Sequence, residues 1–180
     1  MHEINRAYRR ADTAHLRMPR GEDAIAIRDI AAATGVLDVN STYAYLLWTT
    51  DFAASSIVAE NTSGICGFIT GYHPPQRPNV LFVWQVAVAG DMQGQGLATA
   101  MLDALVSRIR SERRGHPITM ETTVTPGNTA SRKLFGAFAR RHGVTLAERP
   151  HFSAALLDAD GGHEDEPMLR IGPFAAPSSS

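Results

Sequence analysis

The most continuous apolar run of the chain is VLFVWQVAVA, at residues 80–89. A strand that is buried on both faces shows such a run, whereas a half-buried strand alternates. The run therefore predicts a central strand covered on both faces. Before it, SSIVAE and ICGFITGYH flank the turn NTSG and predict a hairpin. The segment PPQRP, at residues 74–78, forces a loop because proline cannot donate to a ladder.

Helical periodicity occurs on both sides of this strand. Residues 21–35 place apolar side chains on one face and end at Gly35, which suits the C′ position. Asn40 or Ser41 is well placed to cap a second helix. Two later helices are predicted from apolar stripes at helical spacing: Leu97, Met101, Leu105 and Ile109 in one, and Leu134, Phe135 and Phe138 in the other.

Shorter segments rich in β-forming residues complete the pattern. They lie at residues 15–18, 118–124, 145–148 and 168–174, and a polar loop, GGHEDEP, precedes the last of them. The order is a short strand, two helices, three strands, a helix, a strand, a helix and two strands. This order predicts an α/β sandwich. We expect one domain over residues 15–174, with flexible tails at 1–14 and 175–180.

The composition narrows the classes of function. The 180 residues are 44% hydrophobic and 19% charged, and the net charge of −1 gives no electrostatic basis for binding nucleic acid or an anionic membrane. No apolar run approaches the ~20 residues of a membrane span. Cys66 is the single cysteine, so an internal disulfide is excluded, and we expect a buried packing residue in a cytoplasmic protein. No cluster of ligand residues has metal-binding spacing, so we expect no metal.

A glycine-rich turn, GDMQGQG, joins the central strand to the third helix. The first N–H groups of a helix lack intrahelical partners, and the helix dipole adds positive character, so the turn predicts an anion site. A Walker loop would need G-x-x-x-x-G-K-[ST], which is absent. A dinucleotide fingerprint would need a third glycine where Thr99 stands, and it normally follows the first strand of a βαβ unit.

The remaining pattern, Q-x-x-G-x-A at residues 93–98, resembles the pyrophosphate loop of the GCN5-related N-acetyltransferases. A second element of that superfamily is matched by NTASRKLF, at residues 128–135. The resemblance implies an α/β fold with a mixed, largely antiparallel central sheet flanked by helices on both faces, and acetyl-CoA as co-substrate. It also implies coenzyme contacts from Val86, Val88, Gln93, Gly94, Gln95, Gly96, Leu97, Ala98, Asn128 and Ser131.

Three stretches outside the coenzyme motifs are similar to the diaminobutyrate acetyltransferases: GVLDVNSTYAYLL, TGYHPPQRPNVLFVWQVAV and RPHFSAALLDADGGHEDEPMLRIG. The resemblance covers residues 17–174. It implies transfer of acetyl to the 4-amino group of L-2,4-diaminobutyrate, a step of ectoine biosynthesis under osmotic stress, in a cytoplasmic homodimer.

This acceptor carries two amines and a carboxylate, so it needs polar anchors. The candidates are Asp38, before the second helix, Trp84, in the central strand, and Glu164 and Glu166, in the acidic loop. The sequence does not distinguish Glu164 from Glu166. Trp84 could equally be a core residue, the acidic loop a solvated turn, and Asp38 a helix-start residue favoured by the dipole.

One position departs from the superfamily pattern. Many members carry a tyrosine after the leucine of the second element, where it protonates the leaving thiolate, and here Phe135 stands in that place. The other candidate donors are Tyr43, Tyr45, Tyr72 and water, because a thiolate with a pKa near ~8.5 leaves without strong acid assistance. Two other functions stay open: acetylation of another small amine or a protein N-terminus, and a non-catalytic coenzyme A-binding sensor.

Overall fold

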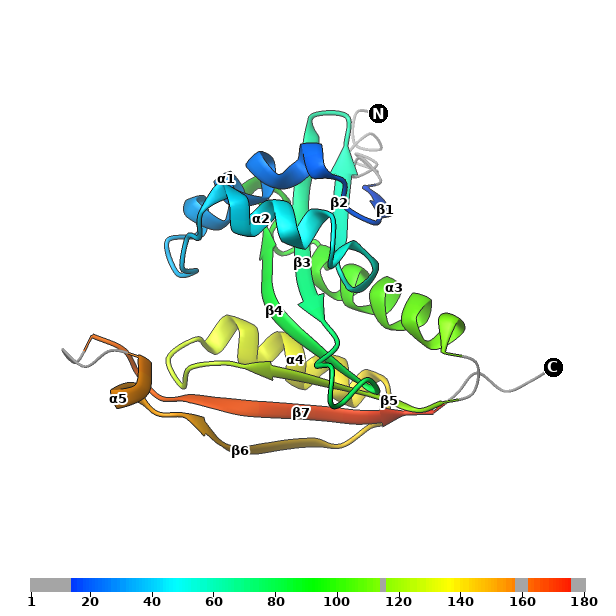
Figure 1. The fold of residues 1–180 in the computed structure, drawn as a ribbon, viewed down its shortest axis with the longest axis vertical. Helices are drawn as coiled ribbons and strands as arrows, with labels where there is room; N and C mark the ends of the chain where they lie inside the picture. The colour runs from blue at the N-terminus through cyan, green and yellow to red at the C-terminus, as the bar shows by residue number, and fades with distance from the viewer. Residues whose placement is uncertain (1–13, 114–115, 158–161, 176–180) are drawn as a thin grey trace, which may run out of the picture.

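The computed structural model describes residues 14–113, 116–157 and 162–175 (Figure 1). The tails predicted for 1–14 and 175–180 lie, apart from one residue each, outside these ranges. The elements in chain order are β1 (His15–Arg17), η1 (Gly21–Asp23), α1 (Ala24–Thr34), α2 (Thr42–Thr49), η2 (Ala53–Ser55), β2 (Ile57–Asn61), β3 (Gly64–Tyr72), β4 (Val80–Val88), η3 (Gly90–Met92), α3 (Leu97–Glu112), β5 (Ile118–Thr123), α4 (Thr129–Arg141), β6 (Leu146–Phe152), α5 (Ala154–Leu157) and β7 (Glu166–Phe174).

The strands of the described ranges form one seven-stranded sheet in the order β1-β2-β3-β4-β5-β7-β6. Neighbouring strands are antiparallel except β4 and β5, which run parallel. The predicted element order, the β2–β3 hairpin and the loop at 74–78 are therefore confirmed. β4 lies in the middle of the sheet, as its apolar run predicts.

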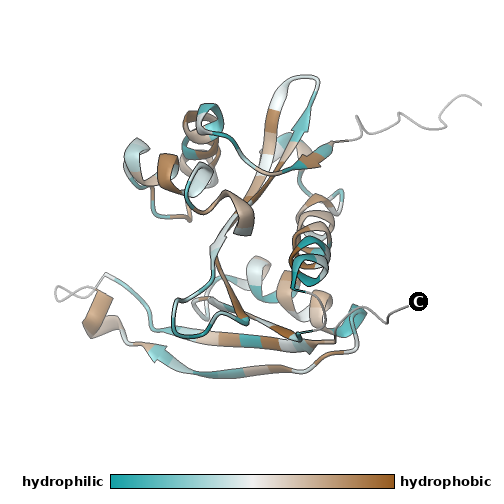
Figure 2. Ribbon diagram, turned by 45° about the vertical axis from the view of Figure 1, so that its right-hand side comes forward, coloured by the Kyte–Doolittle hydropathy of each residue, from teal (hydrophilic) through white to brown (hydrophobic). Residues whose placement is uncertain are grey.

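Helices cover both faces of the sheet, with α1 and α2 on one face and α3 and α4 on the other (Figure 1). On the α1 and α2 side, Ile27 and Tyr45 pack with Phe68 of β3 in one buried cluster. On the opposite side, a larger cluster joins α3 and α4 to the strands. Hydrophobic and hydrophilic residues both occur along α3 (Figure 2), and its buried residues are Met101, Leu102, Leu105, Val106 and Ile109. No helix in the described part of the chain is long and apolar enough to cross a membrane.

Local signals set the helix ends. α1 ends at Gly35, whose φ of 66° is in the left-handed region where only glycine is unstrained. Ser41 caps α2, because its Oγ accepts from the backbone N–H of Ala44 at 3.2 Å. Asn128 caps α4 in the same manner and accepts from the N–H of Ser131 at 3.0 Å. Of the two caps considered for α2, Ser41 is the one used.

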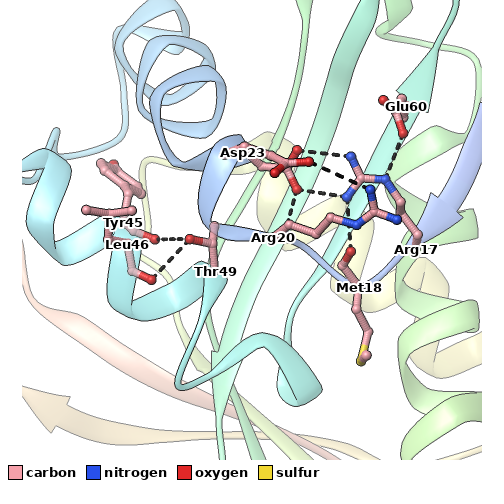
Figure 3. Close-up of polar contacts among 9 residues, drawn as sticks. Arg17, Met18, Arg20, Asp23, Tyr45, Leu46, Thr49 and Glu60 are labelled. Atoms are coloured by element: carbon pink, nitrogen blue, oxygen red, sulfur yellow. Dashed lines mark hydrogen bonds and ion pairs between the residues drawn. The ribbon is translucent and has the colours of Figure 1, made fainter.

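A buried ion pair ties the start of α1 to the edge of the sheet (Figure 3). Arg17 of β1 donates to both carboxylate oxygens of Asp23, at 2.8 and 3.0 Å, and to Glu60 of β2 at 2.7 Å. The backbone N–H of Arg20 also donates to Asp23 at 2.7 Å. Burial alone would raise the pKa of Asp23, but these hydrogen bonds outweigh it and hold the pKa below its usual value.

Two segments near the C-terminus differ from the predicted boundaries. β6 extends to Phe152 through Pro150, which is tolerated because β6 is an edge strand and needs no donor on its outer side. β7 begins at Glu166 instead of residue 168, so Glu166 belongs to a strand and not to the acidic loop. The short helix α5 was not predicted.

Candidate functional site

The glycine turn after β4 has the backbone geometry of an anion site. Gly94 and Gly96 have φ values of 74° and 79°, and Gly96 is the N-cap of α3 without a side-chain capping bond. A Cβ added at either glycine would meet no heavy atom within 4 Å. The first N–H groups of α3 are therefore free of a capping side chain and border open space, where the helix dipole favours an anion.

A cavity of about 510 Å³ extends from this turn along β4 to the start of α4. Its walls include Val86 and Val88 of β4, the turn itself, Asn128 and Ser131 at the start of α4, and residues at the end of α1 and in the loop after it. Every residue predicted to contact the coenzyme lines this cavity except Gln95. The side chain of Gln95 turns away and its Nε2 donates to the Asp91 carbonyl at 3.0 Å.

The cavity exists because β4 and β5 separate. They pair only from Val80 to Phe82, opposite Thr119 to Glu121, and β4 continues to Val88 without β5 beside it. Ala89 donates its N–H to Cys66 of β3 at 2.9 Å. Because backbone direction alternates along an antiparallel strand, Val86 and Val88 point their N–H and C=O groups away from β3, into the opening. The Val88 carbonyl accepts from Gln93 Nε2 at 3.2 Å, and the groups on this edge that are not bonded can pair with an extended ligand as a further strand would.

A β-bulge re-aims the side chains of β4 at this point. Thr70 of β3 is opposite Gln85, and Gly71 is opposite Val83, so Trp84 is the additional residue of β4. Trp84 is half-buried and stacks on Trp48 of α2, with ring centroids 4.7 Å apart. The bulge therefore turns Trp84 toward the α2 side, where a second cavity opens.

This second cavity, of about 220 Å³, contains three of the four candidate acceptor residues: Asp38, Trp84 and Glu166. The remaining lining residues are Val36, Leu37, Asn40, Gln85, Thr123, Val124, Thr125 and Asn128. Val36, Leu37 and Asn128 also line the larger cavity, so the two cavities adjoin. The structure thus brings a turn suited to an anion next to a pocket with two carboxylates.

The model of the Acetyltransferase (GNAT) family matches residues 25–139 of the chain.

The chain belongs to the GNAT acetyltransferase family.

Two curated relatives of this GNAT protein are named L-2,4-diaminobutyric acid acetyltransferase. The one from Streptomyces coelicolor is 48% identical over 159 residues, which cover 88% of this chain and 92% of the relative. The one from Halomonas elongata is 40% identical over 165 residues, which cover 91% of this chain and 83% of the relative.

One similar solved structure is the diaminobutyrate acetyltransferase EctA of Paenibacillus lautus, in complex with L-2,4-diaminobutyric acid and coenzyme A. Its TM-score to this chain is 0.82 and the two sequences are 37% identical. The match covers 92% of this chain and 98% of that one. Ard1 from Thermoplasma volcanium, at 18% identity and a TM-score of 0.67, shares the fold. The fold predicted from the sequence is confirmed.

The two carboxylates in the smaller cavity differ in their partners. The Thr123 hydroxyl donates to Glu166 Oε2 at 2.6 Å. No described residue donates to the carboxylate of Asp38, which is therefore open to a ligand. The Asp38 backbone carbonyl, in contrast, accepts from Gln85 Nε2 at 2.9 Å. Sequence reasoning did not find Gln85 or Thr123, because neither belongs to a motif.

Glu164 lies outside both cavities. Its Oε2 accepts from the backbone N–H of Gly127 at 3.2 Å, in the turn that leads to the α4 cap. A Cβ at Gly127 would lie 2.9 Å from that oxygen, so glycine permits the approach. Of the two glutamates between which the sequence did not distinguish, only Glu166 lines the smaller cavity among the described residues.

The tyrosine candidates for proton donation lie outside both cavities, as do Phe135, His73 and His163. Phe135 is 2% exposed and packs in the core, so the place of the family tyrosine is turned away from the opening. Tyr43 is exposed, and the hydroxyl of buried Tyr45 donates to Gln85. Tyr72 packs against Trp48, Phe52 and Phe82.

His73 Nδ1–H donates to the Val80 carbonyl at 2.7 Å, and burial lowers the pKa of its ring. His163 is exposed.

The described residues contain no group of three or more His, Cys, Asp or Glu side chains that could hold a metal ion.

Proposed function

We propose that this chain transfers the acetyl group of acetyl-CoA to the 4-amino group of L-2,4-diaminobutyrate, a step of ectoine biosynthesis. The observation that carries the proposal is the contact between the two cavities. One is lined by the glycine turn and the free edge of β4, and the other contains Asp38, Trp84 and Glu166. The relatives that bear this enzyme's name match the chain over most of its length.

The larger cavity suits the coenzyme. The turn and the first N–H groups of α3 receive the pyrophosphate, because they combine unpaired donors with the positive helix end. The backbone groups of Val86 and Val88 pair with the amides of the pantetheine arm. Asn128 and Ser131 border the same path from α4. A backbone N–H near Val86 polarises the thioester carbonyl.

The smaller cavity suits a molecule with two ammonium groups. Asp38 has no protein donor in the described part of the chain, so its carboxylate holds one of them. Glu166, oriented by Thr123, faces the same space from β7. Trp84, supported by Trp48, forms an apolar wall. The coenzyme path reaches this space at Asn128, which lines both cavities.

The reaction needs a neutral amine. An alkylammonium with a pKa near ~10 must lose its proton before attack, which costs about 4 kcal/mol at pH 7. The nitrogen lone pair then forms a bond to the thioester carbon, the C–S bond breaks, and the sulfur leaves as a thiolate with a pKa near ~8.5. The acylated nitrogen, which became positively charged on attack, releases a second proton to solvent and leaves the neutral amide. Such a leaving group tolerates protonation by water, in agreement with the buried position of Phe135.

The test is acetyl transfer by the purified protein. With acetyl-CoA and L-2,4-diaminobutyrate, we expect free thiol and N4-acetyldiaminobutyrate to appear in equal amounts. Lysine, a diamine and a peptide with a free N-terminus serve as competing acceptors. Faster turnover of any of these amines would refute diaminobutyrate as the acceptor, but the protein would still be an acetyltransferase. Coenzyme binding without single-turnover transfer to any amine would favour the sensor.

A pair of neighbouring glutamates tests the acceptor site. Glu166→Gln removes a charge from the cavity, and we expect kcat/KM for diaminobutyrate to fall about 10- to 100-fold, the range for a hydrogen bond to a charged group. Glu164→Gln keeps an oxygen that can accept from Gly127 and is the matched control. We expect it to change kcat/KM for diaminobutyrate by less than about threefold. The reverse ranking would place Glu164 in the site and remove Glu166 from it.

We also propose that the enzyme is a cytoplasmic homodimer. Its support is exposed apolar surface in two places: Leu156 and Leu157 on α5 are 71% and 38% exposed, and Tyr43 and Leu46 on α2 are 71% and 39% exposed. The free cysteine, Cys66, agrees with a reducing compartment. Sedimentation velocity at micromolar concentration gives the oligomeric state. A monomer under these conditions would refute the dimer, and cell fractionation tests the location.

A further inference from the structure

Gln85 connects a buried tyrosine of α2 to the loop that carries Asp38. Its side chain is 5% exposed, and both ends of the amide are bonded. Oε1 accepts from the Tyr45 hydroxyl at 3.2 Å, and Nε2 donates to the Asp38 backbone carbonyl at 2.9 Å. Tyr45 is 0% exposed and packs in the cluster between α1, α2 and the sheet. A hydrogen-bonded chain thus runs from the helical layer through β4 to the acceptor cavity.

The loop between α1 and α2 is joined to the sheet by this hydrogen-bonded chain and by the packing of Leu37. Val36, Asp38 and Val39 are exposed, and Leu37 packs partly against the core cluster. The carboxylate of Asp38 has no donor among the described residues, so the position of its backbone sets which space the carboxylate can reach. That backbone is held at its carbonyl by Gln85 and, at 3.3 Å, by Asn40 Nδ2.

We propose that Gln85 is a positioning residue for the acceptor: it fixes the backbone at Asp38 so that the carboxylate faces the smaller cavity. This inference rests on the proposed function in one respect, the role of Asp38 in holding an acceptor ammonium. Gln85 lines the smaller cavity and not the larger one. Its loss therefore acts on acceptor binding and leaves coenzyme binding intact.

The chemistry of the amide explains why glutamine suits this position. It accepts from a hydroxyl and donates to a carbonyl at the same time. A glutamate could accept from Tyr45 but could not donate to the Asp38 carbonyl, and an apolar side chain would serve neither partner. The bulge at Trp84 turns Gln85 toward α2, so the position arises from the register of β4 with β3.

The test is Gln85→Met, which keeps the length of the side chain and removes both hydrogen bonds. We expect KM for diaminobutyrate to rise about fivefold, the loss expected for one hydrogen bond. The values of kcat and of KM for acetyl-CoA should stay within about twofold, since Gln85 contacts neither reacting atom. An unchanged acceptor KM, or an equal rise in both KM values, would overturn the inference.

A double-mutant cycle separates positioning from general damage. If Gln85 acts through the carboxylate of Asp38, the fivefold effect of Gln85→Met disappears in an Asp38→Ala background, where no carboxylate remains to orient. A full fivefold effect in that background would show that Gln85 acts by another route. Thr49→Val is the matched control. The Thr49 hydroxyl is also buried in α2 but, within the described ranges, bonds only to the Tyr45 and Leu46 carbonyls of its own helix (Figure 3).

Hydrogen exchange provides a readout that does not depend on the substrate. The amides of residues 36–40 should exchange faster in Gln85→Met than in the wild type, and at the wild-type rate in Thr49→Val. Unchanged exchange in Gln85→Met would refute the positioning role, whichever amine the enzyme acetylates. A wild-type enzyme that does not turn over diaminobutyrate would instead refute the proposed acceptor alone.

Discussion

Gly96 and Gly143 form a matched pair for testing the anion turn. Both have positive φ, 79° and 62°, and both stand at a helix end, Gly96 before α3 and Gly143 after α4. A Cβ at either position would meet no heavy atom within 4 Å. Alanine therefore introduces backbone strain without a clash, at about 1–2 kcal/mol for a left-handed residue. For a chain of this size we expect both variants to melt roughly 2–8 °C below the wild type.

Only Gly96 lines the larger cavity. Its added methyl group would occupy the space through which, in the proposed function, phosphate oxygens approach the backbone donors of α3. Losing one such charge-assisted hydrogen bond weakens binding about tenfold or more. We expect titration calorimetry to show this loss in coenzyme A affinity for Gly96→Ala and none for Gly143→Ala.

The comparison of the two variants isolates the role of the turn. Equal melting shifts with equal, unchanged affinity would refute the assignment of this turn to the pyrophosphate. A weaker affinity in both variants would attribute the effect to general destabilisation.

Three further predictions follow from buried groups. Phe135→Tyr adds a hydroxyl to a core position that is 2% exposed, so we expect a loss of about 1–3 kcal/mol in urea unfolding and no rise in kcat. Burial raises the pKa of the Cys66 thiol, so Ellman's reagent should label it slowly in the folded protein and rapidly in urea; equally fast labelling would contradict its burial. Arg17→Leu leaves the Asp23 carboxylate buried without its partner, at a cost of about 3 kcal/mol at pH 7 by urea unfolding. Because the folded-state pKa of Asp23 is lowered, this stabilisation is present above pH ~4 and is lost as the pH falls through the lowered pKa, so wild type and variant should converge there.

The parts of the fold that the sequence predicts are those with local causes. The apolar run of β4, the stripe of α3 and the glycine that ends α1 each depend on residues within one or two turns of the chain. The end of β6 and the start of β7 have no such local signal. Pro150 suggests a break, and only the position of β6 at the sheet edge makes a proline acceptable there.

The candidate site also has a part that local sequence predicts and a part that it does not. The larger cavity is lined by the two motifs and the end of β4, which the sequence locates, and by Thr34, Val36 and Leu37, which it does not. The acceptor cavity joins a loop near residue 38 to β4, β5 and β7, and which acidic side chain enters it depends on strand register. Glu166 faces the cavity because β7 already begins there and Thr123 of β5 holds its carboxylate. A pattern of acidic residues in sequence carries no information about that register.

The bulge at Trp84 accounts for the arrangement of both cavities. Before it, β4 pairs with β5; beyond it, β4 pairs with β3 alone, which frees the edge at Val86 and Val88 for a ligand. The same additional residue brings Trp84 against Trp48 and turns Gln85 toward Tyr45. One insertion in the ladder thus opens the donor path on one side and shapes the acceptor pocket on the other. Because both depend on it, we expect the amine and the thioester of the proposed reaction to meet beside the bulge, where Asn128 borders both cavities.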